Sequence, residues 1–142
     1  MVTGASGAIP RNDIGRMREH AEKYYAQIRG RTTDVAAIAQ NTGISSSEIE
    51  IVKRHIFFNR YDLGEEEITR FDADYDMAVS WQRLIEGKNI QEMDIIMLRH
   101  ELMEYEFMIG QGLSYSEAHA ITEKKYNYSQ YVKALDRKAG LE

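Results

Sequence analysis

The residues with the clearest chemical potential lie in the stretch LRHELMEYEFM, residues 98–108. His100 and Glu104 are four residues apart, so on a helix they share one face and lie one turn apart. A histidine and a carboxylate at this spacing can bind one Zn²⁺, and Glu101 stands where a general base would be needed. His119 follows on the next predicted helix and can supply a third ligand. The sequence therefore predicts a zinc site formed by His100, Glu104 and His119, with Glu101 as the base.

The same histidines also suit a reaction without a metal. His55, His100 and His119 occur in helical segments that can pack together. Because histidine titrates near neutral pH, two of them can exchange protons with a substrate, one as base and one as acid. In this second hypothesis His100 and His119 share proton transfer, and Glu101 or Glu104 orients one imidazole. His55 is an additional candidate, although a histidine at the end of a helix also interacts favourably with the helix dipole.

Two arginines are candidates for holding a phosphate group. Arg70 occurs in TRFD and Arg83 in WQRL, and a guanidinium can contact a phosphate through two hydrogen bonds. Together with the histidines they form the equipment of a metal-independent ribonuclease. Both arginines also have ordinary partners nearby, because Arg70 can pair with Asp72 and Arg83 with Asp76. The sequence leaves these alternatives open.

The segment KKYNYSQY, residues 124–131, contains Tyr126 and Asn127. Aromatic rings next to lysines suit stacking on nucleotide bases, so these two residues are candidates for substrate binding. The same pattern suits a seam that closes a helical bundle, and both interpretations stay open.

Two further motifs match known binding sites only in part. The segment DVAAIAQNTGISSSEIEIVKRHI has the spacing of a helix-turn-helix around Gly43. Its Glu48 and Glu50 would repel the DNA backbone, so a corner of a helical bundle is the better interpretation. The segment DADYD begins like a calcium loop, but Met77 and Arg83 stand where an EF-hand needs glycine and glutamate. Its carboxylates are expected to cap a helix.

The candidate residues need a scaffold, and the sequence predicts a helical one. Capping residues precede apolar stretches of helical period, and glycines follow several of them. The expected helices run from Asp13 to about Arg29, within TTDVAAIAQNTG up to Gly43, from Ser45 to about Phe58, from Asp74 or Asp76 to Gly87, from about Ile90 to Ile109 with Asn89 as cap, from Ser114 to about Tyr126, and from Ser129 to Lys138. Residues 59–75 lack a sustained period and are expected to form a long loop or a short hairpin. The predicted fold is all-α, a compact bundle of six or seven helices with one long irregular central loop.

Composition favours one globular domain. The 142 residues are 43% hydrophobic and 29% charged, with a single proline and no cysteine. Residues 1–11 are predicted to be a flexible segment and residues 12–142 one all-α domain. No apolar run reaches the ~18 residues of a membrane span and no secretory leader is evident, so we expect a cytoplasmic protein. The net charge of −5 provides no long-range attraction to nucleic acid.

The chain resembles a domain found at the C-terminal end of phage minor head (Mu F-like) proteins and of bacterial polymorphic toxins. The resemblance covers residues 35–128 and runs in order through IAQNTGIS, VKRHIFF, RFDADYDMAVSWQRLIEGKNI, LRHELMEYEFM and AHAITEKKYNY. It implies an effector module joined to an N-terminal carrier or phage head protein and, for a toxin, an immunity protein as partner. The residues that stand in these motifs are His55, Arg70, Asp72, Trp81, Arg83, His100, Glu101, Glu104, His119, Tyr126 and Asn127.

These observations support one leading expectation and two alternatives. The leading one is a phage-associated toxin or effector enzyme, a hydrolase that cleaves RNA or DNA by His/Glu acid–base chemistry with arginine contacts to phosphate. One alternative is a zinc-dependent hydrolase built on the HExxE helix and His119. The other is a non-catalytic phage structural or partner-binding module whose polar residues form a buried network. The lack of cysteine also fits a protein that must unfold to enter a recipient cell.

Overall fold

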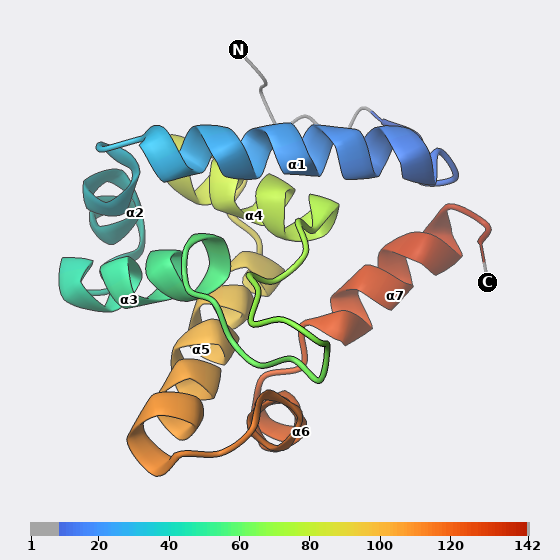
Figure 1. The fold of residues 1–142 in the computed structure, drawn as a ribbon. Coiled ribbons are helices and arrows are strands. Elements are labelled where there is room, and N and C mark those ends of the chain that lie inside the picture. The colour runs from blue at the N-terminus through green and yellow to red at the C-terminus, as the bar shows by residue number, and fades with distance from the viewer. Residues whose placement is uncertain (1–8, 142) are drawn as a thin grey trace.

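Seven α-helices and one short π-helix make up the part of the chain that the computed structural model describes, residues 9–141 (Figure 1). Within these residues no strand forms, and one isolated antiparallel bridge joins Tyr61 to Thr69. The prediction of a compact all-α bundle with an irregular central loop is confirmed. The elements are α1 (Ile14–Gly30), α2 (Asp34–Thr42), α3 (Ser46–Phe57), α4 (Tyr75–Glu86), α5 (Glu92–Tyr105), the π-helix η1 (Glu106–Gly110), α6 (Tyr115–Lys125) and α7 (Ser129–Lys138).

Four helices begin where the sequence predicts, at Asp13, Ser45, Asp74 and Ser114, because a side chain satisfies one of their first N–H groups. Ser114 Oγ accepts a hydrogen bond from Glu117 N at 3.2 Å, and the Glu117 carboxylate accepts one from Ser114 N at 3.2 Å. The capping box that opens α6 is therefore confirmed. Asp74 Oδ1 accepts a hydrogen bond from Met77 N at 3.0 Å and begins α4. This part of the DADYD segment is a helix cap, as expected.

The start of α5 differs from the prediction. Asn89 is not its cap, because α5 begins only at Glu92, and Asn89 lies in the preceding turn with φ 57. The cap is Gln91, whose N–H donates to Asp94 Oδ2 at 2.9 Å. The same carboxylate also binds Arg83 of α4, so one buried side chain fixes the connection between the two helices.

The centre of the bundle lies where α3, α4 and α5 meet. Phe57, Trp81 and Leu98 come from these three helices, and each is at most 2% exposed. The long helix α1 crosses α4 and α3 on one side, and α6 packs against α5 and η1 at the opposite end (Figure 1). Helix α7 extends away from this centre and has no buried residue.

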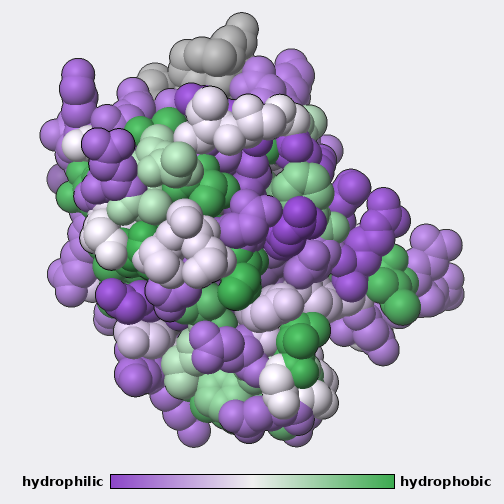
Figure 2. Space-filling model, turned by 90° about the vertical axis from the view of Figure 1, so that its left-hand side faces the viewer, coloured by the Kyte–Doolittle hydropathy of each residue, from purple (hydrophilic) through white to green (hydrophobic). Residues whose placement is uncertain are grey.

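The side of the molecule that carries α2 and α3 has a mixed surface. Hydrophilic residues cover most of it, with smaller hydrophobic areas between them (Figure 2). None of the described helices combines the length and the apolar character that a membrane span requires.

The predicted flexible segment, residues 1–11, is described only from residue 9 onward. Arg11 departs from this prediction, because its guanidinium is held by two carboxylates. It donates to Asp76 at 2.7 and 3.1 Å and to Asp136 at 2.8 Å. These acids belong to α4 and α7, so Arg11 connects the entry of α1 to both helices.

A buried ion pair joins α2, α3 and α4. Lys53 Nζ lies 2.8 Å from Asp34 Oδ1 and donates to the Arg31 carbonyl at 2.7 Å. Trp81 Nε1 donates to the second oxygen of Asp34 at 3.2 Å. Asp34 is fully buried and Lys53 is 5% exposed, so each charge depends on the other for its stabilisation.

We expect Asp34→Asn to lower the free energy of unfolding by about 2 kcal/mol, because a neutral amide of similar size replaces the charged partner of Lys53. Urea denaturation followed by circular dichroism measures this change. Glu50→Gln is the control, since Glu50 pairs with Arg54 on the exposed surface of α3. It is expected to change the free energy of unfolding by less than about 0.5 kcal/mol. Equal effects of the two substitutions would contradict this role of Asp34.

Candidate metal centre

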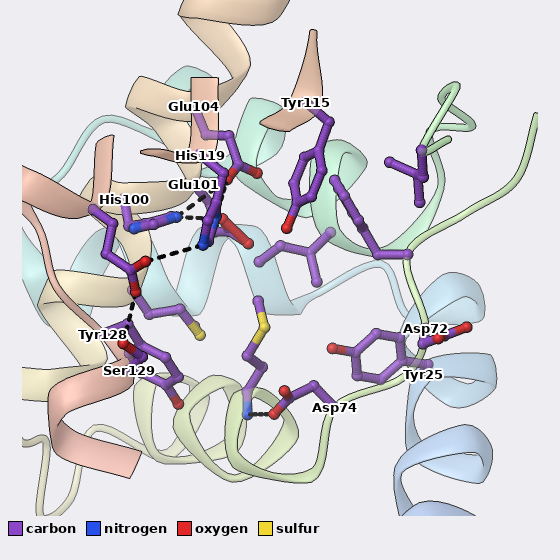
Figure 3. A pocket seen from close by; sticks show the side chains of 16 residues that line it. Tyr25, Asp72, Asp74, His100, Glu101, Glu104, Tyr115, His119, Tyr128 and Ser129 are labelled. Atoms are coloured by element: carbon purple, nitrogen blue, oxygen red, sulfur yellow. Dashed lines mark hydrogen bonds and ion pairs between the residues drawn. The ribbon is translucent and has the colours of Figure 1, made fainter. Parts of the chain in front are cut away.

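Three histidines from three helices surround the carboxylate of Glu104. His55 of α3 places Nε2 2.8 Å from Glu104 Oε1. His100 Nε2 of α5 lies 3.2 Å from Oε2, and His119 Nδ1 of α6 lies 2.8 Å from the same oxygen. Figure 3 shows His100, His119 and Glu104 close together at one end of a pocket. The structure thus brings these four candidate residues into one cluster.

Helix geometry and one sharp turn explain this meeting. His100 and Glu104 lie one turn apart on α5, as their spacing predicts. After η1 the chain reverses through Gly112, which has φ 69, and the Ser114 cap then begins α6. His119 occupies the second turn of α6, on the side that packs against α5.

His100 is held as an imidazolium. Its Nδ1 lies 2.8 Å from the Tyr126 carbonyl, which can only accept, so Nδ1 carries a proton. Its Nε2 faces the Glu104 carboxylate, which also accepts. Burial alone would lower the pKa of His100, but the hydrogen bond to Glu104 and the charge of Glu101 raise it to about 9. The ring is therefore fixed at both nitrogens.

The two buried glutamates of α5, Glu101 and Glu104, have opposite environments. Burial would raise the pKa of Glu104, but the hydrogen bonds from His100 and His55 lower it well below its usual range. Glu101 is 8% exposed, makes no hydrogen bond, and has His100 Nε2 at 3.9 Å as its nearest cationic atom. Burial, and then the charge of Glu104, raise the pKa of Glu101. Glu101 is thus a buried carboxyl group without a hydrogen-bond partner.

The remaining ring nitrogens of His119 and His55 also have partners. His119 Nε2 lies 3.3 Å from Glu123 Oε2. His55 Nδ1 lies 2.8 Å from the Tyr61 hydroxyl, which accepts a hydrogen bond from Asn59 Nδ2 at 2.9 Å. The Tyr61 O–H can then donate to His55, and this pattern places the His55 proton on Nε2, facing Glu104.

The atoms His100 Nε2, Glu104 Oε2 and His119 Nδ1 are suited to one metal ion. They lie within 4.8 Å of one another. Zinc binds such atoms at about 2.0–2.2 Å, so its ligand atoms lie about 3.3–3.5 Å apart. The distances from Glu104 Oε2 to His119 Nδ1 and His100 Nε2, 2.8 and 3.2 Å, are those of hydrogen bonds, in which a proton lies between the two atoms. A bound ion would replace these protons, with side-chain shifts that bring all three ligand atoms to the spacing of zinc ligands.

The outer contacts fit such an ion as well. Metal-binding histidines usually donate their second nitrogen to a carbonyl or a carboxylate. His100 does so to the Tyr126 carbonyl, and His119 faces the Glu123 carboxylate. The other oxygen of Glu104 accepts from His55. All three ligands are therefore oriented by further contacts.

A second set of atoms also meets the distance requirement, from His55, Glu101 and Glu104. The imidazole of His55 is fully buried, and its Nε2 proton already serves the bond to Glu104. Two dications beside two buried carboxylates would leave excess positive charge away from water. The cluster therefore favours one ion, bound by His100, Glu104 and His119.

A cavity of about 380 Å³ opens beside the cluster (Figure 3). His100, Glu101, Glu104 and His119 line one end of it. Asp72 and Asp74 lie at the other end, beyond a stretch of apolar side chains. The candidate ligands and the candidate base thus face a space that a small molecule or a side chain can enter.

The two predicted phosphate-binding arginines are not part of this cavity. Arg83 donates two hydrogen bonds to the buried Asp94, at 2.8 and 2.7 Å, and not to Asp76 as expected. Arg70 does not line the cavity either, and its buried Nε has no hydrogen-bond partner. It lies close enough to Arg29 to lower the pKa of that group, after the larger effect of burial.

Tyr126 and Asn127 also differ from their predicted role. Tyr126 contributes its backbone carbonyl to His100, while its ring lies 5.4 Å from Lys125 Nζ. The side chain of Asn127 accepts from Gln130 N at 3.1 Å and so begins α7. Neither side chain lines the cavity. The segment is thus a connection that orients a histidine.

Sequence reasoning missed two residues of α6 that line the cavity, Tyr115 and Glu123. Both are four residues from His119, so their positions on one helix face were visible in the sequence. In Figure 3 the Tyr115 hydroxyl points into the cavity. Tyr61 was missed because no periodic signal places a loop residue against a helix.

The chain was also compared with known proteins. No model of a protein family, no curated protein and no solved structure matches it.

Proposed function

We propose that this domain is a zinc-dependent hydrolase. His100, Glu104 and His119 bind the ion, and Glu101 is the general base. The support is the meeting of three ligand atoms, with oriented outer contacts, at the end of a cavity that also contains Glu101.

One observation favours this function over metal-free acid–base catalysis. Both nitrogens of His100 face protein atoms, the Tyr126 carbonyl and the Glu104 carboxylate. Both nitrogens of His119 face carboxylates, those of Glu104 and Glu123. Neither ring presents a free nitrogen to a substrate, as direct proton transfer requires. An ion in place of the shared protons would leave the outer contacts intact.

The residues of the chain have distinct roles in this proposal. When bound, Zn²⁺ would polarise the substrate and lower the pKa of a bound water. Glu101 accepts a proton from the attacking water and passes it to the leaving group. Glu123 and the Tyr126 carbonyl orient the two imidazoles, and His55 holds the second oxygen of Glu104.

The resemblance to C-terminal domains of phage head proteins and toxins supports a biological context for the hydrolase. In this context it is the effector module of a longer carrier chain, it acts in the cytoplasm of a recipient bacterium, and an immunity protein neutralises it.

Protein purified without chelator is expected to contain about one Zn²⁺ per chain, measured by elemental analysis. His119→Gln is expected to weaken zinc binding by about 100-fold or more, because it removes one of three ligands. His20→Gln is the matched control, since this histidine lies on α1 beside Tyr75, away from the cluster. Zinc below about a tenth of an equivalent in the wild type, or equal zinc in both variants, would contradict the proposal.

A further inference from the structure

The charge of the cavity wall limits the class of substrate. Five carboxylates line the cavity, and no lysine or arginine is among the described residues that do; the acids are Asp72, Asp74, Glu101, Glu104 and Glu123. Their negative charges outnumber the two positive charges of one bound dication. A nucleic acid strand carries phosphates on both sides of the bond to be cleaved, and its binding depends on positive side chains. This cavity repels such a strand.

The middle of the cavity is apolar. Its apolar lining residues are Ile56, Leu63, Phe71, Met77 and Met97. Methionine side chains adapt to different shapes, so this wall accepts an aliphatic or aromatic group without strict selection. A space of about 380 Å³ is at the small end of the range for ligand sites. It suits one or two amino-acid side chains.

The far end of the cavity suits a cation. Asp72 and Asp74 are both exposed there, and Asp72 makes no hydrogen bond or ion pair with the described residues. Asp74 Oδ1 accepts the hydrogen bond that caps α4. An amino group that reaches this end of the cavity would be attracted by both carboxylates.

The reacting end contains groups suited to a neutral carbonyl. Glu101 is more than nine-tenths buried, lacks a hydrogen-bond partner and lines the cavity. The Tyr115 hydroxyl points into the cavity and makes no hydrogen bond with the described residues (Figure 3). A phenol is protonated at neutral pH, so it can donate to a carbonyl oxygen on which negative charge develops.

On the basis of the zinc-dependent hydrolysis proposed above, we propose that the substrate is a peptide or peptide-like amide with an apolar side chain and a nearby amino group. Water adds to the amide carbonyl, the C–N bond breaks, and the products are a carboxylate and an amine. Glu101 carries one proton of the water to the departing nitrogen. The leading alternative from sequence, cleavage of RNA or DNA, becomes an outcome of the test.

The test uses the zinc-loaded domain with a mixed peptide library, and with RNA and DNA strands in parallel. Mass spectrometry of the peptides and gels of the nucleic acids report cleavage. We expect cleavage of peptides in which lysine or a free amino terminus lies near an apolar residue, and intact nucleic acids. Cleavage of RNA or DNA, or an intact library with zinc bound, would overturn the inference. Absence of zinc would instead overturn the proposed function.

Selectivity provides the second measurement. In Asp72→Asn/Asp74→Asn the ratio of kcat/KM for a cationic peptide to that for its neutral analogue is expected to fall about fivefold or more. Asparagine retains the cap of α4, so the helix is preserved. Glu65→Gln/Glu66→Gln is the matched control, because it changes the charge equally on the same loop outside the cavity. An unchanged ratio in the aspartate variant, with zinc content intact, would contradict the role of these two residues.

Discussion

Glu101→Gln is expected to abolish hydrolysis while the fold and the zinc content stay unchanged. Glutamine has nearly the same size as glutamate but cannot accept the proton of the attacking water. Because Glu101 makes no hydrogen bond and its nearest cationic atom, His100 Nε2, is 3.9 Å away, its replacement breaks no hydrogen bond of the cluster. Loss of a general base typically reduces the rate by about 10²–10⁴-fold. This is the largest change in activity that the structure predicts for a substitution outside the metal ligands.

The measurement is the rate of peptide cleavage by variant and wild type at equal zinc content. If the domain is a toxin, bacterial growth provides a second readout, with arrest by the wild type and none by the variant. Glu106→Gln is the control, because Glu106 is exposed on η1 only two residues after Glu104. An active Glu101→Gln variant would contradict the mechanism. Harmless expression of an active wild-type domain would favour the non-catalytic phage role over the toxin role.

Glu104→Ala is expected to cause the largest loss of stability. In the metal-free protein its carboxylate accepts contacts from His55, His100 and His119, and it is the nearest partner of the His100 imidazolium. Removing one member of a buried charge pair costs about 3–5 kcal/mol, because the other charge stays buried without compensation. The same substitution removes a metal ligand, so zinc binding is lost as well.

Urea denaturation in the presence of chelator measures the free energy of unfolding of this variant. Glu123→Gln is the comparison, because Glu123 contacts only His119 in the cluster and is partly exposed. Its cost is expected to stay below about 1 kcal/mol. A Glu104→Ala variant as stable as the wild type would show that the histidine cluster does not hold the helices together.

Local spacing accounts for what the sequence could predict. The capping box of Ser114 and the four-residue interval between His100 and Glu104 are properties of one helix, so both were readable from adjacent residues. The approach of His119 needed only one further step, a short turn between neighbouring helices.

Choices among distant partners explain what the sequence could not predict. Arg83 had several possible acidic partners. Its partner is Asp94 because the turn between α4 and α5 brings these two side chains together. This turn depends on the left-handed backbone conformation of Asn89, which the spacing of apolar residues does not predict. Arg70 and Tyr61 lie in the central loop, where side-chain direction follows from packing and not from spacing.

The separate origins of the three proposed ligands have a consequence for the unfolded chain. His100 and Glu104 share α5, but His119 lies beyond a chain reversal and the supporting His55 lies far upstream. An extended polypeptide therefore has no assembled metal centre and cannot carry out the proposed hydrolysis. The centre forms only when the bundle folds, and since the chain has no cysteine, folding requires no disulfide-forming oxidant.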